Sequence, residues 1–174
     1  MALDKFPIRG VTSATVRGLA TLNTNKVLLL FMSYKGIYKL KNPKKYIGNP
    51  NMVVYRSLWE RKFMRHLDGT PAVKKWASEE ISIPYYNPVK KRMARYFPDF
   101  YMEYVDSSGK TRKSLIEVKP LKETKPPVFK KRTKNVLIAE AMYSQNQAKW
   151  AAAEEFCLDN GLEFKIMTEV ELGV

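Results

Sequence analysis

The chain has 174 residues, 45% of them hydrophobic and 28% charged, which suits a folded globular domain and excludes wholesale disorder. Lysines and arginines number 31 against 17 acids, and the resulting net charge of +14 indicates a polyanionic partner, nucleic acid first, unless it serves solubility alone. The single cysteine excludes an intramolecular disulfide and a cysteine-based zinc site, and the longest apolar run, residues 27–32, is too short to cross a membrane.

Residues 1–31 differ in composition from the rest of the chain. They are rich in Thr, Ser, Ala and Gly, they are nearly free of acids, and they show no sustained helical or strand period. Met32 then opens the sequence MSYKGIYKLKNPKKY. We expect residues 1–31 to be an N-terminal extension, for which a leader, an arm and an artefact are the three explanations, and residues 32–174 to form a single domain.

Residues 34–50 are basic and rich in turn-forming residues, with tyrosines between the lysines. Lysines meet phosphates, while aromatic rings stack on bases or pack in a core. The segment is therefore either a DNA-contacting arm or a solvated loop, with neither explanation favoured. In the first case the lysines that bind backbone phosphates are Lys39, Lys41, Lys44 and Lys45.

A helix is predicted at residues 54–67, where apolar residues recur at helical spacing and an Asp-Gly pair ends the pattern. Glu60 in this helix has two interpretations. If the helix starts at Ser57, Glu60 satisfies backbone amides in a capping box. If the helix starts nearer residue 54, Glu60 shares the buried face and points toward the sheet. We favour the second, because an inward carboxylate would then have a cation as its partner.

Residues 76–84 are predicted to form a strand, and the basic turn NPVKKR follows it. Lys90, Lys91 and Arg92 in this turn are expected to bind DNA phosphates. The turn leads through RYFPDF into a predicted β-hairpin at residues 98–120.

The predicted hairpin, PDFYMEYVDSSGKTRKSLIEVKP, has a distinctive arrangement of charges. Its loop SSG suits a three-residue turn with Gly109 in the left-handed conformation. Counting outward from this loop places Asp99 opposite Glu117, and strand alternation puts both on the same face as Lys119. The residues expected on the opposite, core-facing side are Phe100, Met102, Ile116 and Val118.

Two opposed carboxylates repel each other, which a sequence selected only for stability would avoid. A divalent cation between Asp99 and Glu117 would turn the repulsion into chelation, and Mg²⁺ suits one or two carboxylates together with a phosphate. Lys119 could orient or help deprotonate a water, or stabilise charge developing on the phosphate. These groups suffice for phosphodiester hydrolysis, and the alternative is a surface hairpin with scattered charges.

A lysine- and proline-rich loop is expected at residues 119–134, and its adjacent prolines exclude regular structure in its middle. Its positive field is expected to bind DNA. The residues that we assign to this contact are Lys130, Lys131 and Arg132.

The last predicted elements are a long helix at residues 135–159 and a strand at residues 163–168. Gln145, Asn146 and Lys149 lie within one turn of this helix, where a solvated polar face is the simplest explanation. The order of elements indicates an α/β fold of the α+β type, with a mixed β-sheet flanked by α-helices.

The acids and the lysine carry a resemblance. Glu60 on a helix, Pro98-Asp99 before one strand and Glu117-Val118-Lys119 at the end of the next resemble the PD-(D/E)XK nuclease superfamily, which implies a restriction-endonuclease-like fold. The stretches YRSLWERKFMRHLD, SEEISIPY, LIEVKP and NQAKWAAAEEFCLDNGLEFKIMTE are similar to TnsA-type transposon endonucleases and, more closely, to the head completion nucleases of T-even-like tailed phages. The resemblance covers about residues 33–172.

The resemblance implies a role for each matching residue. Asp99, Glu117 and the Val118 carbonyl would bind Mg²⁺, for which Mn²⁺ would substitute. Lys119 would be catalytic and Glu60 would assist. Lys149, with Asn146 beside it, would have an auxiliary role in the site.

The expected function is that of a Mg²⁺-dependent DNA endonuclease in phage head completion and DNA packaging. Its partners would be double-stranded DNA and a capsid or portal protein, and it would act in the host cytoplasm or in the virion, without contact with a membrane. One alternative is a TnsA-like transposition or repair endonuclease. Another is a non-catalytic, structural DNA-binding head protein.

Overall fold

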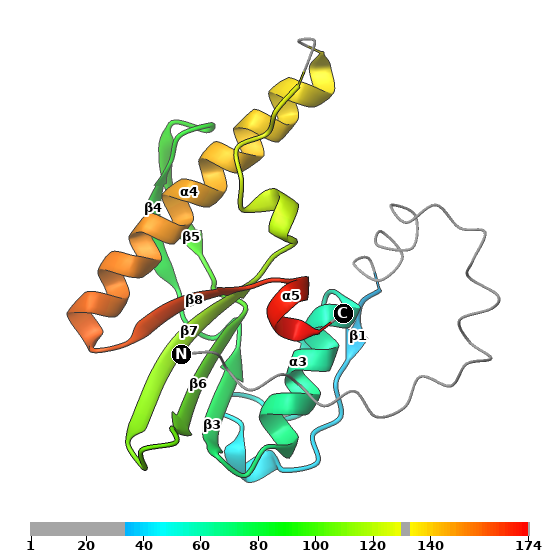
Figure 1. Cartoon of the computed structure of the whole chain (residues 1–174), viewed down its shortest axis with the longest axis vertical. Coiled ribbons are helices and arrows are strands. Elements are labelled where there is room, and N and C mark those ends of the chain that lie inside the picture. The colour runs from blue at the N-terminus through cyan, green and yellow to red at the C-terminus, as the bar shows by residue number, and fades with distance from the viewer. Residues whose placement is uncertain (1–33, 130–132, 174) are drawn as a thin grey trace, which may run out of the picture.

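The computed structural model describes residues 34–129 and 133–173. The predictions for residues 1–31, and for Lys130, Lys131 and Arg132, therefore lie outside the described residues. The elements in chain order are β1 (Gly36–Ile37), the 3₁₀ turn η1 (Pro43–Lys45), β2 (Val54–Tyr55), α3 (Leu58–Gly69), β3 (Val73–Ser78), β4 (Ile83–Asn87), β5 (Arg92–Tyr96), β6 (Phe100–Val105), β7 (Thr111–Val118), the 3₁₀ turn η2 (Leu121–Glu123), α4 (Lys134–Asn160), β8 (Glu163–Met167) and α5 (Glu169–Leu172) (Figure 1).

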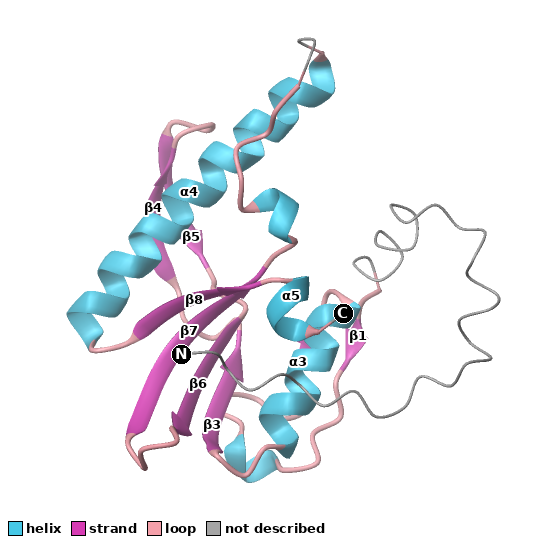
Figure 2. Cartoon of the chain, viewed as in Figure 1, coloured by secondary structure: helices cyan, strands magenta, loops and turns pink. Residues whose placement is uncertain are grey.

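The central sheet has the strand order β3-β6-β7-β8, with β8 parallel to β7 and the other pairs antiparallel (Figure 2). Its middle is the predicted hairpin, in which Phe100 pairs with Ile116 and Glu103 with Lys113. Gly109 in the connecting loop has a φ of 78°, as a left-handed turn position requires. The predicted register of the hairpin is therefore confirmed.

Helices cover both faces of this sheet, so the expected mixed sheet flanked by helices is confirmed. On one face α3 brings Phe63 and Met64 into a core with Phe100 and the other inward residues of the hairpin. On the other face α4 packs Ala153 against Leu115 and the separate two-stranded hairpin of β4 and β5. None of the described helices combines the length and the apolarity that crossing a membrane requires.

The predicted strand at residues 76–84 is wrong, because the structure divides it between two sheets. β3 ends at Ser78 and pairs with β6, whereas β4 begins at Ile83 and pairs with β5. The division falls at Glu79, whose φ of 55° lies in the left-handed region and breaks the extended chain. Nothing in a glutamate signals this conformation in advance.

The predicted start of the first helix is also wrong. Residues 54–55 form β2, and α3 begins at Leu58 with Ser57 as its N-cap. The Ser57 hydroxyl oxygen accepts the Glu60 backbone N–H at 3.1 Å. A serine at this position satisfies an N–H group that the first turn of a helix leaves unpaired, and this local gain fixes the boundary.

Candidate active site

Three of the predicted site residues come together at the end of β7. The Val118 backbone N–H donates to Asp99 Oδ2 at 2.7 Å, which holds the aspartate against the neighbouring strand. Lys119 Nζ lies 3.3 Å from Glu117 Oε1, and the Glu117 side chain is only 4% exposed. The hairpin thus gathers two carboxylates and one ammonium, because strand pairing fixes their order and their face.

The electrostatics of this group favour a bound cation. Burial raises the pKa of Asp99 well above its usual range, and the nearby charges of Glu117 and Glu60 raise it further. Burial lowers the pKa of Lys119, but the attraction of Glu117 and Asp99 outweighs that effect and leaves the pKa raised. Lys119 is therefore a firmly protonated cation, and the carboxylates retain an unfavourable excess of negative charge.

Tyr96, at the end of β5, belongs to the site although the sequence did not single it out. Its hydroxyl donates to Glu117 Oε2 at 2.6 Å, and the side chain is buried. Burial and the charge of Glu117 raise the pKa of Tyr96, so the phenol stays neutral and remains a donor. A tyrosine two residues before Pro98-Asp99 was the available signal, but it looks like any core aromatic.

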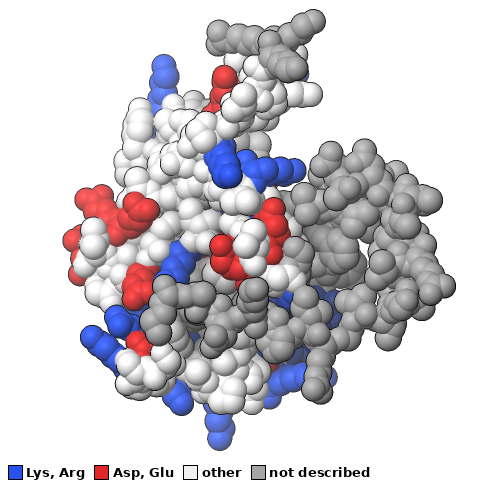
Figure 3. Space-filling model, in the orientation of Figure 1, with Lys and Arg blue, Asp and Glu red and all other residues white. Residues whose placement is uncertain are grey.

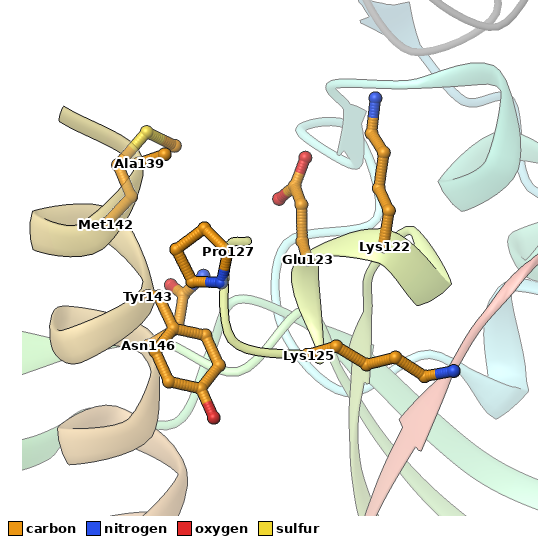
Figure 4. A pocket seen from close by; sticks show the side chains of 8 residues that line it. All are labelled: Lys122, Glu123, Lys125, Pro127, Ala139, Met142, Tyr143 and Asn146. Atoms are coloured by element: carbon orange, nitrogen blue, oxygen red, sulfur yellow. The ribbon is translucent and has the colours of Figure 1, made fainter. Parts of the chain in front are cut away.

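Lys149 reaches the site from α4. Its Nζ lies 5.5 Å from the centroid of the Tyr96 ring, a cation–π distance. Asn146, one turn earlier, is buried and lines a cavity of about 180 Å³ between α4 and the segment that begins at η2 (Figure 4). Gln145, the preceding residue, is not among the residues that line this cavity, and its Nε2 donates to the Tyr85 hydroxyl at 2.9 Å.

Glu60 caps α3, as the first of its two interpretations expected. Its Oε2 accepts the Arg56 backbone N–H at 2.7 Å, and its Oε1 accepts the Ser57 hydroxyl at 2.9 Å. Burial raises the pKa of Glu60, and its charge reaches Asp99. The described residues contain no group of three or more acids, histidines or cysteines placed to hold a metal ion, so Glu60 does not form such a group with Asp99 and Glu117.

An ion pair ties the start of α3 to the site. The Arg56 guanidinium makes two bonds of 2.7 Å to the Glu79 carboxylate, and the Glu79 backbone N–H donates to the Asp99 carbonyl at 3.2 Å. These contacts hold Glu79 in its left-handed conformation. Arg56 and Glu79 thus connect the capped start of α3 with Asp99, which lies just before β6.

The oxygens of the site fit a hard divalent cation. Val118 N–H satisfies one oxygen of Asp99, and no described residue donates a hydrogen bond to the other. Tyr96 satisfies one oxygen of Glu117, and Lys119 is the partner of the other among the described residues. Two carboxylates and a nearby carbonyl are the donor set with which Mg²⁺ or Mn²⁺ retains waters and accepts a phosphate oxygen.

The segment at residues 34–50 is packed against the body of the protein. Tyr38 and Tyr46 are buried, so neither can stack on a base. The Asp68 carboxylate accepts the backbone N–H of Lys41 at 2.7 Å, and Lys45 Nζ donates to the Thr70 carbonyl at 2.7 Å. The segment is thus neither a free arm nor a solvated loop, and Lys45 is committed to the end of α3.

The remaining predicted DNA-binding residues that the structure describes are exposed. They are Lys39, Lys41, Lys44, Lys90, Lys91 and Arg92. Figure 3 shows basic side chains projecting from several edges of the face in view, while acidic ones gather in a few groups.

Two comparisons relate this chain to known endonucleases. A family model described as TnsA-like endonuclease N terminal matches residues 70–169, which include Asp99, Glu117 and Lys119. The head completion nuclease of Enterobacteria phage T4 is 40% identical over 146 residues, covering 79% of this chain and 93% of that protein. The family model covers more than half of this chain, and the match to the T4 protein extends over most of both chains. This chain therefore belongs to the TnsA-like endonuclease family.

Proposed function

We propose that this chain is a DNA endonuclease that uses Mg²⁺, with Mn²⁺ as a substitute, and that it acts in the completion of a phage head. The name of the T4 relative supports the second part. The observation that carries the first part is the pair of carboxylates of Asp99 and Glu117, each with one oxygen fixed by a hydrogen bond, beside the Lys119 ammonium.

In this proposal Asp99, Glu117 and the Val118 carbonyl hold the metal, which supplies a Lewis acid for the phosphate. The Val118 N–H and the Tyr96 hydroxyl hold the two carboxylates in place before the metal binds. Lys119, 3.3 Å from Glu117, stabilises the charge that develops on the phosphate or orients the attacking water.

Lys149 and Asn146 are assigned to the phosphate side of the site. Lys149 lies over Tyr96, and Asn146 lines the adjoining cavity together with Lys125. A cation and an amide on this part of α4 would orient the DNA backbone without reading its sequence. Glu60 assists through its charge on Asp99 and through the helix end that it caps.

The partners proposed are double-stranded DNA and a capsid or portal protein, and the location proposed is the infected host cell or the virion. A TnsA-like transposition or repair endonuclease would use the same site, so the genomic neighbours of the coding sequence separate these two functions. A structural DNA-binding head protein would bind DNA without cutting it.

The test is cleavage of plasmid DNA by the whole chain in Mg²⁺, in Mn²⁺ and in EDTA. Nicked or linear product is expected with either metal, no product with EDTA, and a loss of at least about 100-fold in rate for Lys119→Ala. Lys110→Ala removes a lysine at the other end of β7 and should cleave like the wild type. Binding without cleavage in both metals would favour the structural alternative.

A further inference from the structure

The end of the β4–β5 hairpin, residues 86–93, presents basic and apolar side chains together on the protein surface. We call it the hairpin tip. Lys90, Lys91 and Arg92 are exposed, and no acid occurs anywhere from residue 81 to residue 98. The large apolar or aromatic side chains exposed beside them are Tyr86 at 56%, Val89 at 48% and Met93 at 63%.

The hairpin tip is held rigidly from its buried side. Asn87 is 1% exposed, and its Oδ1 accepts the backbone N–H groups of Val89 and Lys90, both at 3.0 Å. Its Nδ2 donates to the Tyr85 hydroxyl, which also accepts from Gln145 on α4. Buried amide and phenol groups thus anchor an exposed turn to the long helix, which pre-organises it for contact with a partner.

Lys91 occupies the one strained position of this turn. Its φ of 49° lies in the left-handed region, where glycine or asparagine is the less strained choice. A lysine is placed there in spite of that strain. Strain of this kind is characteristic of residues held for a function.

We propose that the hairpin tip enters the major groove of the duplex on which the site acts, with its cations on the flanking phosphates and its apolar side chains against base edges. The choice of partner follows from charge, since a polyanion complements a surface with no acids. The choice of groove follows from size. A two-stranded ribbon about 10 Å wide with its side chains fits the major groove of about 12 Å but not the minor groove of about 6 Å.

The length of β5 sets the distance between the hairpin tip and the candidate active site. β5 runs from the tip at Arg92 to Tyr96, whose hydroxyl binds Glu117. Five residue steps from Lys91 to Tyr96 span about 17 Å in an extended strand. That length corresponds to about five base pairs, so the groove contact lies within about half a turn of the cut phosphate. This inference rests on the proposed function.

Binding is measured with the full chain carrying Glu117→Ala, so that no cleavage occurs. Lys91→Asn, added to this background, relieves the strain and removes one charge, and we expect about fivefold weaker binding to a 20-base-pair duplex with an unchanged or higher melting temperature. Lys110→Asn is the matched control, because it removes the same charge from an exposed position at the far end of β7. It should weaken binding less than twofold.

The groove is identified by chemical interference on the same duplex. Methylation of guanine N7, which faces the major groove, should weaken binding to this duplex, and Tyr86→Ser with Met93→Ser should abolish that effect. Netropsin, a minor-groove ligand, should not compete. Competition by netropsin without N7 interference, or equal effects of Lys91→Asn and Lys110→Asn, would overturn the proposal and leave the exposed apolar residues to a protein partner. These readouts do not depend on catalysis, so they fail independently of the proposed nuclease activity.

Discussion

Single hydrogen bonds decide how the site is prepared for a metal. The Glu117 side chain is less than 5% exposed, so a carboxylate oxygen without a hydrogen-bond partner would be costly there. The Tyr96 hydroxyl supplies that partner. The bond also fixes which oxygen of Glu117 remains for other contacts. Tyr96 is thus a positioning residue, which acts through Glu117.

Tyr96→Phe should weaken the binding of Mn²⁺ by about 10-fold while the fold is kept, because groups that orient metal ligands typically contribute this much to affinity. Isothermal titration calorimetry of the DNA-free protein with Mn²⁺ measures this affinity. Tyr85→Phe is the matched control, since it removes another buried, hydrogen-bonded hydroxyl from the same hairpin. An affinity unchanged by Tyr96→Phe, or lowered equally by both variants, would remove Tyr96 from the site.

His66, the one histidine in the chain, should make the protein less stable as the pH falls. Burial lowers its pKa below the ordinary value of 6.5, so the unfolded state binds a proton more readily than the folded state. The stabilisation that neutral His66 contributes is complete above pH 6.5. It is lost as the pH falls from 6.5 through the lowered pKa of the folded state.

Urea unfolding of wild type and His66→Gln between pH 7.5 and 5.5 measures this effect. The difference in the free energy of unfolding between the two proteins should narrow as the pH falls. Titrations of Asp99 and Glu60 are common to both proteins and cancel in this difference. A constant or widening difference would show that the folded state does not disfavour the imidazolium.

At the scale of elements, the N-terminus of α3 shows a local interaction that determines a boundary. Ser57→Ala removes the cap and leaves a Glu60 oxygen without its hydroxyl donor, so the free energy of unfolding should fall by about 1 kcal/mol. Ser57→Asn keeps a capping side chain and should lose less than about half of that amount. Chemical denaturation compares the two, and equal losses would contradict a capping role.

The elements that could be predicted from the sequence are those with a local signal at both ends. The long helix was predicted within one residue, because Thr133 caps its start and Gly161, with a φ of 65°, ends it. The β6–β7 hairpin was predicted because its loop fixes its register. By contrast, α5 was missed although Thr168 and Glu171 form a visible capping box.

What escaped prediction in the site depends on contacts between distant segments. Tyr96 and Glu117 meet only because β5 belongs to a separate hairpin whose chain returns to the central sheet. The Arg56–Glu79 pair requires the break in the chain at Glu79, for which a glutamate gives no signal. Sequence spacing could place the acids of one hairpin together, but it could not place these neighbours.

At the scale of the whole molecule, the positive charge serves more than one purpose. Lys45 and the backbone of Lys41 hold the segment at residues 34–50 against Asp68 and the end of α3. Lys119 pairs with Glu117 in the site. The cations that remain exposed, above all those of the hairpin tip, are the ones available to a polyanion. A net charge of +14 therefore does not correspond to one uniform DNA-binding face.

The most direct test of the account is the anomalous scattering of Mn²⁺ in crystals of the whole chain grown with the ion. We predict one strong peak within coordination distance of the carboxylates of Asp99 and Glu117, and no such peak in crystals of Glu117→Ala. A peak elsewhere with none at this pair, or an unchanged peak in the variant, would contradict the proposal that these two carboxylates bind the catalytic metal.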